Sequence, residues 1–200
     1  MLVNILVSIF GILIFLFLFW KRLKEDYSAE IIFKVCFYIL VGTGAGWALS
    51  IILFPVWFFW LAFTGGVLGF AIAFFLLKVK FYETLEAFII GFLPWLSLIF
   101  LQNSVETSSL SSFLGFLAIL ILTFVSYYFD THYKKFNWYR SGRIGFAGLA
   151  TAGLFFLTRL ILAIFKVPVL SFVGIDEIVI SGILMIVSFV LLFNLGKSKK

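Results

Sequence analysis

Seven long apolar runs constrain this chain more than any other feature of its sequence. Each is close to the roughly 20 mostly apolar residues that an α-helix needs to cross the hydrocarbon core of a bilayer. Their approximate bounds are 2–20, 30–53, 56–78, 84–101, 110–129, 142–165 and 175–194. The runs lack β-barrel alternation, and only helices or closed barrels satisfy backbone polar groups in lipid. The sequence therefore predicts an all-α polytopic membrane protein with one transmembrane domain over residues 1–200.

Composition and charge agree with a membrane protein and argue against a nucleic-acid partner. Hydrophobic residues make up 64% of the 200-residue chain and charged residues 12%, whereas roughly half apolar is normal for a globular domain. The net charge of +6 comes from short clusters between apolar runs, a pattern typical of membrane-surface contacts. The first run has no basic segment before it and no small-residue cleavage site, so we expect a retained helix.

Lysine and arginine alternate regularly between the connections. The first, third and fifth connections and the C-terminus carry them, the second and fourth carry none, and the sixth carries only Lys166. The basic clusters are Lys21, Arg22 and Lys24; Lys78 and Lys80; Lys134, Lys135, Arg140 and Arg143; and Lys197, Lys199 and Lys200. The positive-inside rule then predicts an N-terminus outside and a C-terminus in the cytoplasm. This orientation requires an odd number of spans, and seven agrees with it.

Arg159 stands inside the apolar run 154–165. A guanidinium stays ionised in a bilayer and costs ~3 kcal/mol or more at the midplane, so it needs a partner or an anionic ligand. The predicted orientation places Arg159 roughly 9 Å below the outer end of the sixth span, at 1.5 Å per residue. Glu106, Asp176 and Glu177 are acidic residues on that side, and any of them could pair with it. Alternatively, the guanidinium fork could bind a lipid phosphate in a bidentate manner.

Small residues gather in the second, third and sixth spans. They include Gly42 to Gly46, Thr64 to Gly69, and the series Gly145, Gly148, Ala152 and Gly153. Small residues about four positions apart let helix backbones approach closely in lipid. These three spans are therefore predicted to form the packed centre, with spans one, five and seven outside.

Several of these segments resemble the prolipoprotein diacylglyceryl transferase family. The resemblance lies in Arg140-Ser141-Gly142-Arg143-Ile144-Gly145-Phe146, Leu157-Thr158-Arg159-Leu160, Phe165-Lys166-Val167-Pro168 and Val173-Gly174-Ile175, which are similar to the family's C-terminal block. Gly42 to Gly46 resembles its glycine-rich second helix, and Thr64-Gly65-Gly66 falls where the family carries His-Gly-Gly. The family shares the seven-helix topology with the N-terminus outside.

The resemblance implies a transferase of the bacterial cytoplasmic membrane. Such an enzyme moves the diacylglyceryl group of phosphatidylglycerol to a cysteine thiol of a lipoprotein precursor, with glycerol phosphate as the leaving group. No metal cluster, phosphate-cradling loop or nucleotide fingerprint appears in the sequence, so no cofactor and no metal are expected. Arg159 matches a phosphate-binding arginine of the family. Thr64, Asn103, Glu106 and Asp176 are possible supporting residues, and no catalytic residue is assigned.

Departures from the family pattern keep an alternative function open beside the transferase. Thr64 replaces the family's histidine, Phe155 replaces a tyrosine, and the fourth span lacks an arginine motif. His132 lies on the predicted cytoplasmic side, opposite Arg159. The alternative is a catalytically inactive relative that binds anionic lipid or a partner membrane protein. A small transporter or channel is a third possibility, which the presence of only one firmly intramembrane charge and the lack of a convincing inverted repeat disfavour.

Overall fold

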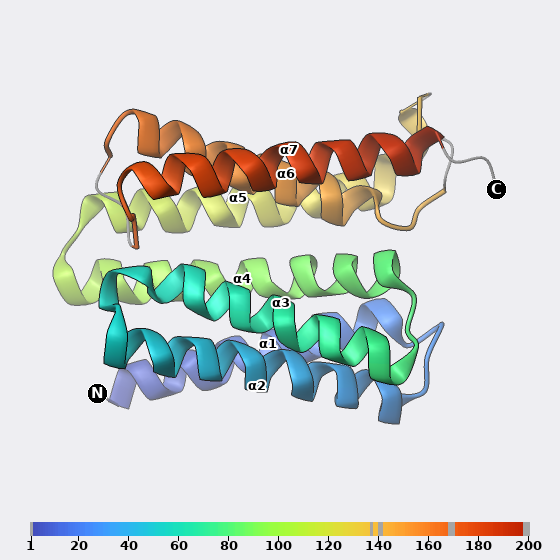
Figure 1. The fold of residues 1–200 in the computed structure, drawn as a ribbon, viewed down its shortest axis with the longest axis horizontal. Coiled ribbons are helices and arrows are strands. Elements are labelled where there is room, and N and C mark those ends of the chain that lie inside the picture. Colours follow the sequence, from blue (N-terminus) through green and yellow to red (C-terminus); the bar gives the residue numbers. More distant parts are fainter. Residues whose placement is uncertain (1, 137, 140–141, 168–170, 198–200) are drawn as a thin grey trace.

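A computed structural model describes residues 2–136, 138–139, 142–167 and 171–197 of the chain. These residues form seven long α-helices and two short 3-10 helices (Figure 1). The elements are α1 (Leu2–Leu23), α2 (Ala29–Leu53), η1 (Pro55–Trp57), α3 (Phe58–Leu77), α4 (Phe81–Thr107), α5 (Leu110–His132), η2 (Tyr133–Lys135), α6 (Phe146–Ile164) and α7 (Ile175–Lys197). Each α-helix is long and apolar enough to cross a membrane. The chain is therefore an integral membrane protein with an all-helical fold, as predicted.

Two helix boundaries differ from the sequence prediction by four residues or more. Helix α4 continues to Thr107, beyond the predicted end at residue 101, with Pro94 inside it. The expected polar loop after this span therefore shrinks to a turn, in which Ser109 caps α5 by accepting a hydrogen bond from the Ser112 amide. Helix α6 begins four residues later than expected, because Gly145 before it has a left-handed backbone with φ of 81°. Three residues that carry the family resemblance, Arg140, Ser141 and Pro168, lie outside the described residues.

The helices run along the long axis of the molecule and alternate in direction (Figure 1). Helices α1–α4 lie on one side and α5–α7 on the other. We call the end with the α2–α3, α4–α5 and α6–α7 connections the Arg159 end, on the left of Figure 1 beside the N-terminus. The opposite end, with the α1–α2, α3–α4 and α5–α6 connections, is the Glu86 end. These names carry no assumption about which end faces the cytoplasm.

Helices α4 and α6 form the packed centre. Over an 18-residue apolar stretch of each helix, the buried share is 50% for α4 and 56% for α6, whereas it lies between 22% and 33% for the other five helices. The small residues of α6 explain its position, since Gly148 packs on the backbone of Glu86 in α4 and Gly153 packs on Phe189 in α7. The prediction that α6 is central is thus confirmed. The prediction that α2 and α3 are also central is wrong.

The glycines of α2 and α3 pack against each other at the periphery of the bundle. A Cβ atom added to Gly42 would overlap the carbonyl oxygen of Gly65, and one added to Gly46 would overlap that of Leu61. Close approach of two backbones explains why small residues recur there. The small residues of α2 and α3 predict that each helix has a close neighbour, but they do not indicate which helix that neighbour is.

Aromatic rings fill the space between α3 and α6. Trp60 stacks on Phe156 with ring centroids 6.3 Å apart, and Phe63 meets Phe156 edge-on at 5.7 Å. Phe59 contacts Phe155 at 5.9 Å. This packing brings the start of α3 next to the part of α6 that carries Arg159.

Candidate functional site

Arg159 forms a buried ion pair with Glu177 at the Arg159 end of the bundle. Arg159 projects from α6 and is 4% exposed, and Glu177 lies in the first turn of α7 and is fully buried. Arg159 Nε donates to Glu177 Oε1 at 2.7 Å, and Nη2 donates to Oε2 at 3.0 Å. This two-point contact occupies one edge of the guanidinium with a carboxylate, in the geometry by which arginine also binds phosphate.

Two further donors complete the hydrogen bonding of the Glu177 carboxylate. Trp60 Nε1 donates to Oε2 at 2.8 Å, and Ser181 Oγ donates to Oε1 at 2.9 Å. Each carboxylate oxygen therefore accepts two hydrogen bonds. A buried ion pair is stable only when its remaining polar atoms are also satisfied, and Glu177 meets this requirement.

Ser171 extends the network to the start of α3. Its carbonyl oxygen accepts from Arg159 Nη2 at 3.2 Å. Its hydroxyl donates to the Val56 carbonyl at 2.8 Å and accepts from the Phe59 amide at 3.1 Å. This network therefore connects η1 and α3 to α6 and α7. We call its members the outer network, a name that assumes nothing about which end faces the cytoplasm: Arg159, Glu177, Trp60, Ser171 and Ser181.

Three aromatic rings surround the guanidinium of Arg159. Its central carbon lies 4.1 Å from the ring centroid of Phe59, 5.3 Å from that of Trp60 and 5.2 Å from that of Phe172. Such contacts stabilise a desolvated cation by about 2 kcal/mol or more. The aromatic rings and Glu177 together account for a charge in an apolar bundle.

The second terminal nitrogen, Nη1, has no hydrogen bond to any described residue. Arg159 also lines a cavity of about 30 Å³ between α4, α5 and α6. Gly115, Ala118 and Thr158 are among its other lining residues. One edge of the guanidinium is therefore occupied by Glu177, and among the described residues Nη1 has no hydrogen-bond partner.

The supporting residues expected from the sequence do not contact Arg159 in the described structure. Thr64, Glu106 and Asp176 are exposed. Asn103 donates to the Ser112 hydroxyl at 2.6 Å, which connects α4 to α5. Among the three acidic candidates for pairing with Arg159, the structure selects Glu177. The neighbouring Asp176 points away because successive helix positions are rotated by about 100°.

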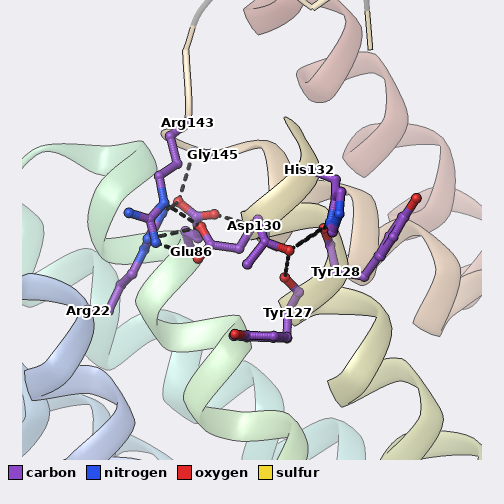
Figure 2. A network of polar contacts seen from close by, with 10 residues as sticks. Arg22, Glu86, Tyr127, Tyr128, Asp130, His132, Arg143 and Gly145 are labelled. Carbon is purple, nitrogen blue, oxygen red and sulfur yellow. Dashed lines mark hydrogen bonds and ion pairs between the residues drawn. The ribbon is translucent and has the colours of Figure 1, made fainter. Parts of the chain in front are cut away.

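A second polar cluster lies at the Glu86 end and joins four helices (Figure 2). Glu86 of α4 is 1% exposed and accepts from Arg22 Nη2 of α1 at 2.7 Å. Its carboxylate also accepts from the Gly145 amide at 2.9 Å and the Gly148 amide at 3.4 Å. These amides belong to the N-terminus of α6, which attracts negative charge. An internal carboxylate therefore occupies this anion-binding position.

Asp130 completes the cluster from α5. It accepts from Arg143 Nε at 2.8 Å and Nη2 at 2.5 Å, and it pairs with Arg22 Nη1 at 3.1 Å. The hydrogen bonds to Asp130 raise the pKa of Arg143 above its ordinary value. We call Arg22, Glu86, Asp130 and Arg143 the inner cluster, and this name likewise assumes nothing about which end faces the cytoplasm. It contains two cations and two carboxylates, and each arginine contacts a carboxylate.

His132 lies beside the inner cluster, at the opposite end of the bundle from the outer network. Its ring stacks on Tyr128 with centroids 4.3 Å apart, and its Nδ1 is 2.8 Å from the Thr131 hydroxyl (Figure 2). It sits at the C-terminus of α5, at the Glu86 end. The imidazole of His132 therefore does not lie near Arg159. Within the described ranges, no three His, Cys, Asp or Glu side chains converge to hold a metal ion.

The sequence alone does not predict the inner cluster, although it carries one signal for it. Glu86 lies within an apolar stretch, where a carboxylate needs a partner just as Arg159 does. The partners Arg22, Asp130 and Arg143 come from connections and helix ends that the sequence reads as interfacial. Only the packing of α1, α4, α5 and α6 shows that they meet.

Comparison with known proteins finds no match to a family model, to a curated protein or to a solved structure. The resemblance to the diacylglyceryl transferase family therefore stays a prediction from the residues that carry it.

Proposed function

We propose that this protein binds anionic phospholipid at its Glu86 end and does not transfer the diacylglyceryl group. The observation that carries the proposal is the distribution of charge between the two ends. In the described part of the chain, the Glu86 end holds ten lysines and arginines and six carboxylates, whereas the Arg159 end holds two cations and three carboxylates. Anionic headgroups attract basic residues near a membrane surface by about 1 kcal/mol each.

The cations available to lipid at the Glu86 end are exposed and have no ion pair with a described residue. These cations are Lys21, Lys24, Lys78, Lys134, Lys135 and Lys197. The buried carboxylates Glu83 and Glu86 and the partly buried Asp130 at this end already have basic partners. Lys24 and Lys197 lie over the rings of Trp20 and Phe193, as side chains at a membrane–water interface do. By the positive-inside rule, this end would face the anionic cytoplasmic leaflet.

The outer network supports a structural role for Arg159 over a phosphate-binding role. Glu177 occupies the Nε–Nη2 edge of the guanidinium, and four donors hold that carboxylate. A phosphate at this edge would have to displace a buried carboxylate, leaving it without its charge partner. This displacement would be costly in an apolar bundle.

Retention of lipid by the purified protein tests the proposal. The wild type is extracted from vesicles that contain equal amounts of phosphatidylglycerol and phosphatidylcholine, and the bound lipid is counted by native mass spectrometry. We expect enrichment of phosphatidylglycerol, and a several-fold loss of this enrichment in the double variant Lys134→Gln/Lys135→Gln. The matched control is Lys166→Gln, which removes an exposed lysine at the Arg159 end. Equal retention of both lipids, or an equal loss in the control, would reject the proposal.

A second candidate function is the transferase itself, and it is favoured by Arg159 Nη1, which has no hydrogen bond to a described residue. A phosphate oxygen at Nη1 would not need to displace Glu177. The test is to incubate the protein with phosphatidylglycerol and a peptide that carries a lipoprotein-precursor cysteine, and to measure the mass of the peptide. We expect no mass gain. A diacylglyceryl adduct that forms with the wild type and is lost in Arg159→Lys would support the transferase instead.

A further inference from the structure

Helix α7 ends at the Glu86 end with a lysine that turns back along the helix. Lys197 is the last residue of α7, and its Nζ lies 4.3 Å from the ring centroid of Phe193, four positions earlier. The Cα–Cβ bonds of a helix tilt toward its N-terminus, which for α7 lies at the opposite end of the bundle (Figure 1). The ammonium group is therefore held over a ring about one helical turn, or ~5 Å, inside the end of α7.

An exposed apolar strip continues from Lys197 along one face of α7. Ile186, Val190 and Phe193, which we call the α7 strip, are 57%, 50% and 51% exposed. Together with Lys197 they recur at intervals of three and four residues, the spacing of one helix face. The distance from Ile186 to Lys197 is roughly 16 Å along the axis, close to the ~15 Å of one leaflet of the hydrocarbon core. The α7 strip and its lysine therefore match the length of a lipid in one leaflet.

The charge at this end of α7 is positive, and no acidic residue of the same segment offsets it. Glu177 is the last acidic residue in the sequence, whereas Lys199 and Lys200 follow Lys197. The ring of Phe193 attracts the ammonium group but does not neutralise it. A cation at the edge of the hydrocarbon is stabilised by an anion, and anionic phospholipids supply one at this depth of a membrane.

We propose that an anionic phospholipid binds along the α7 strip, with its phosphate on Lys197 Nζ and an acyl chain against the three apolar side chains. This assignment rests on the proposed binding of anionic lipid at the Glu86 end, and it names the place where the phosphate is held. Lys134 and Lys135 then attract the lipid from the water side, an effect that salt screens strongly. A direct contact at the edge of the hydrocarbon is screened much less.

A second copy of the chain fits this face less well than lipid does. Two copies in one membrane have the same orientation, so a symmetric dimer through α7 would place the two helices parallel and each residue near its equivalent. Lys197 would then face the partner's Lys197, and like charges repel. A lipid phosphate brings the opposite charge to the same place.

Solid-state NMR measures the contact between Lys197 and phosphate directly. The protein is labelled with ¹⁵N-lysine and placed in bilayers of equal amounts of phosphatidylglycerol and phosphatidylcholine. The Nζ signal of Lys197 is assigned by its loss in Lys197→Gln, and its dephasing by lipid ³¹P reports the proximity of phosphate. We expect this dephasing to be several-fold stronger than that of Lys78, an exposed lysine that caps the end of α3 at the same end of the bundle.

Lipid retention in about 1 M salt, where the screening length is about 3 Å, separates contact from long-range attraction. Under these conditions Lys197→Gln should reduce the enrichment of phosphatidylglycerol several-fold, and Phe193→Ala should also reduce it. The matched controls are Lys78→Gln and Phe124→Ala, which remove an exposed lysine and an exposed ring from other helices. They should leave the enrichment unchanged. All four side chains are exposed, so the fold should tolerate each substitution.

The outcomes distinguish this lipid site from the proposed function. Equal retention of the two lipids by the wild type at low salt would reject both. Enrichment that is lost in Lys134→Gln/Lys135→Gln but survives Lys197→Gln in high salt would overturn the α7 site alone. The same holds for ³¹P dephasing of Lys197 that is no stronger than that of Lys78, and for contacts of Phe193 with a second, differently labelled copy in place of lipid.

Discussion

The indole nitrogen of Trp60 donates a hydrogen bond to Glu177 Oε2 at 2.8 Å, which connects α3 to α7 across 117 positions of the chain. Both side chains are buried, so neither polar group can turn to water instead. A hydrogen bond to a charged group contributes about 1.5–3 kcal/mol to stability. This bond is one of the few direct polar links between α3 and the α6–α7 pair.

Trp60→Phe should therefore lower the free energy of unfolding by about 1.5–3 kcal/mol. The substitution keeps an aromatic ring against Phe156 but removes the donor to Glu177. Equilibrium unfolding in mixed micelles measures the change. Trp57→Phe is the matched control, because Trp57 is partly buried next to the same helix start and its side chain makes no described hydrogen bond. An equal effect of the two substitutions would show that ring volume, not the indole N–H, stabilises this end.

The close contact between α2 and α3 should make the stability of the protein sensitive to substitution of one glycine of α2 and insensitive to substitution of another. Gly46→Ala places a methyl group against the Leu61 carbonyl oxygen and should destabilise the protein by about 1–3 kcal/mol through overpacking. Gly44→Ala meets no atom within 4 Å and should be neutral or stabilising by up to about 1 kcal/mol, because alanine favours the helix. Thermal unfolding of both variants in detergent checks the contrast. Similar melting temperatures for the two would contradict the packing of α2 on α3.

Removal of Arg22 should expose the dependence of the inner cluster on its central cation. Arg22→Gln leaves Glu86 and Asp130 without one of their partners, and should lower the free energy of unfolding by about 3 kcal/mol. Lys21→Gln changes the exposed neighbour and should have an effect below about 0.5 kcal/mol. Unfolding by denaturant titration in micelles compares them. A small effect of Arg22→Gln would mean that Arg143 alone can satisfy the cluster.

The sequence predicts the seven helices because span length and apolar composition are local properties of the chain. It also identifies Arg159, because a charge within an apolar run stands out. It does not identify the partner of Arg159. Asp176 and Glu177 are neighbouring carboxylates that face different directions around the axis of α7, and helix packing decides which of them faces Arg159. Similarly, the small residues of α2 and α3 predict close contact, but apolar helices have no polar face that would indicate which neighbour each one meets.

The inner cluster is harder to predict from the sequence than the pair formed by Arg159 and Glu177. Its members come from α1, α4, α5 and the segment before α6, with up to 121 positions between Arg22 and Arg143. Each residue alone is typical of a membrane-proximal charge. The arrangement arises because α4 sits in the centre of the bundle and brings Glu86 to the N-terminus of α6.

The central claim is that Arg159 is bound to Glu177, and a double-mutant cycle tests it most directly. Arg159→Met and Glu177→Leu should each lower the free energy of unfolding by about 3–5 kcal/mol, because each leaves a buried charge without its partner. The double variant should lose far less than the sum of the two, with a coupling energy of about 3 kcal/mol. The measurement is equilibrium unfolding of the four proteins in the same micelles. Additive effects of the two substitutions would contradict the ion pair, and phosphate binding would then be the better account of Arg159.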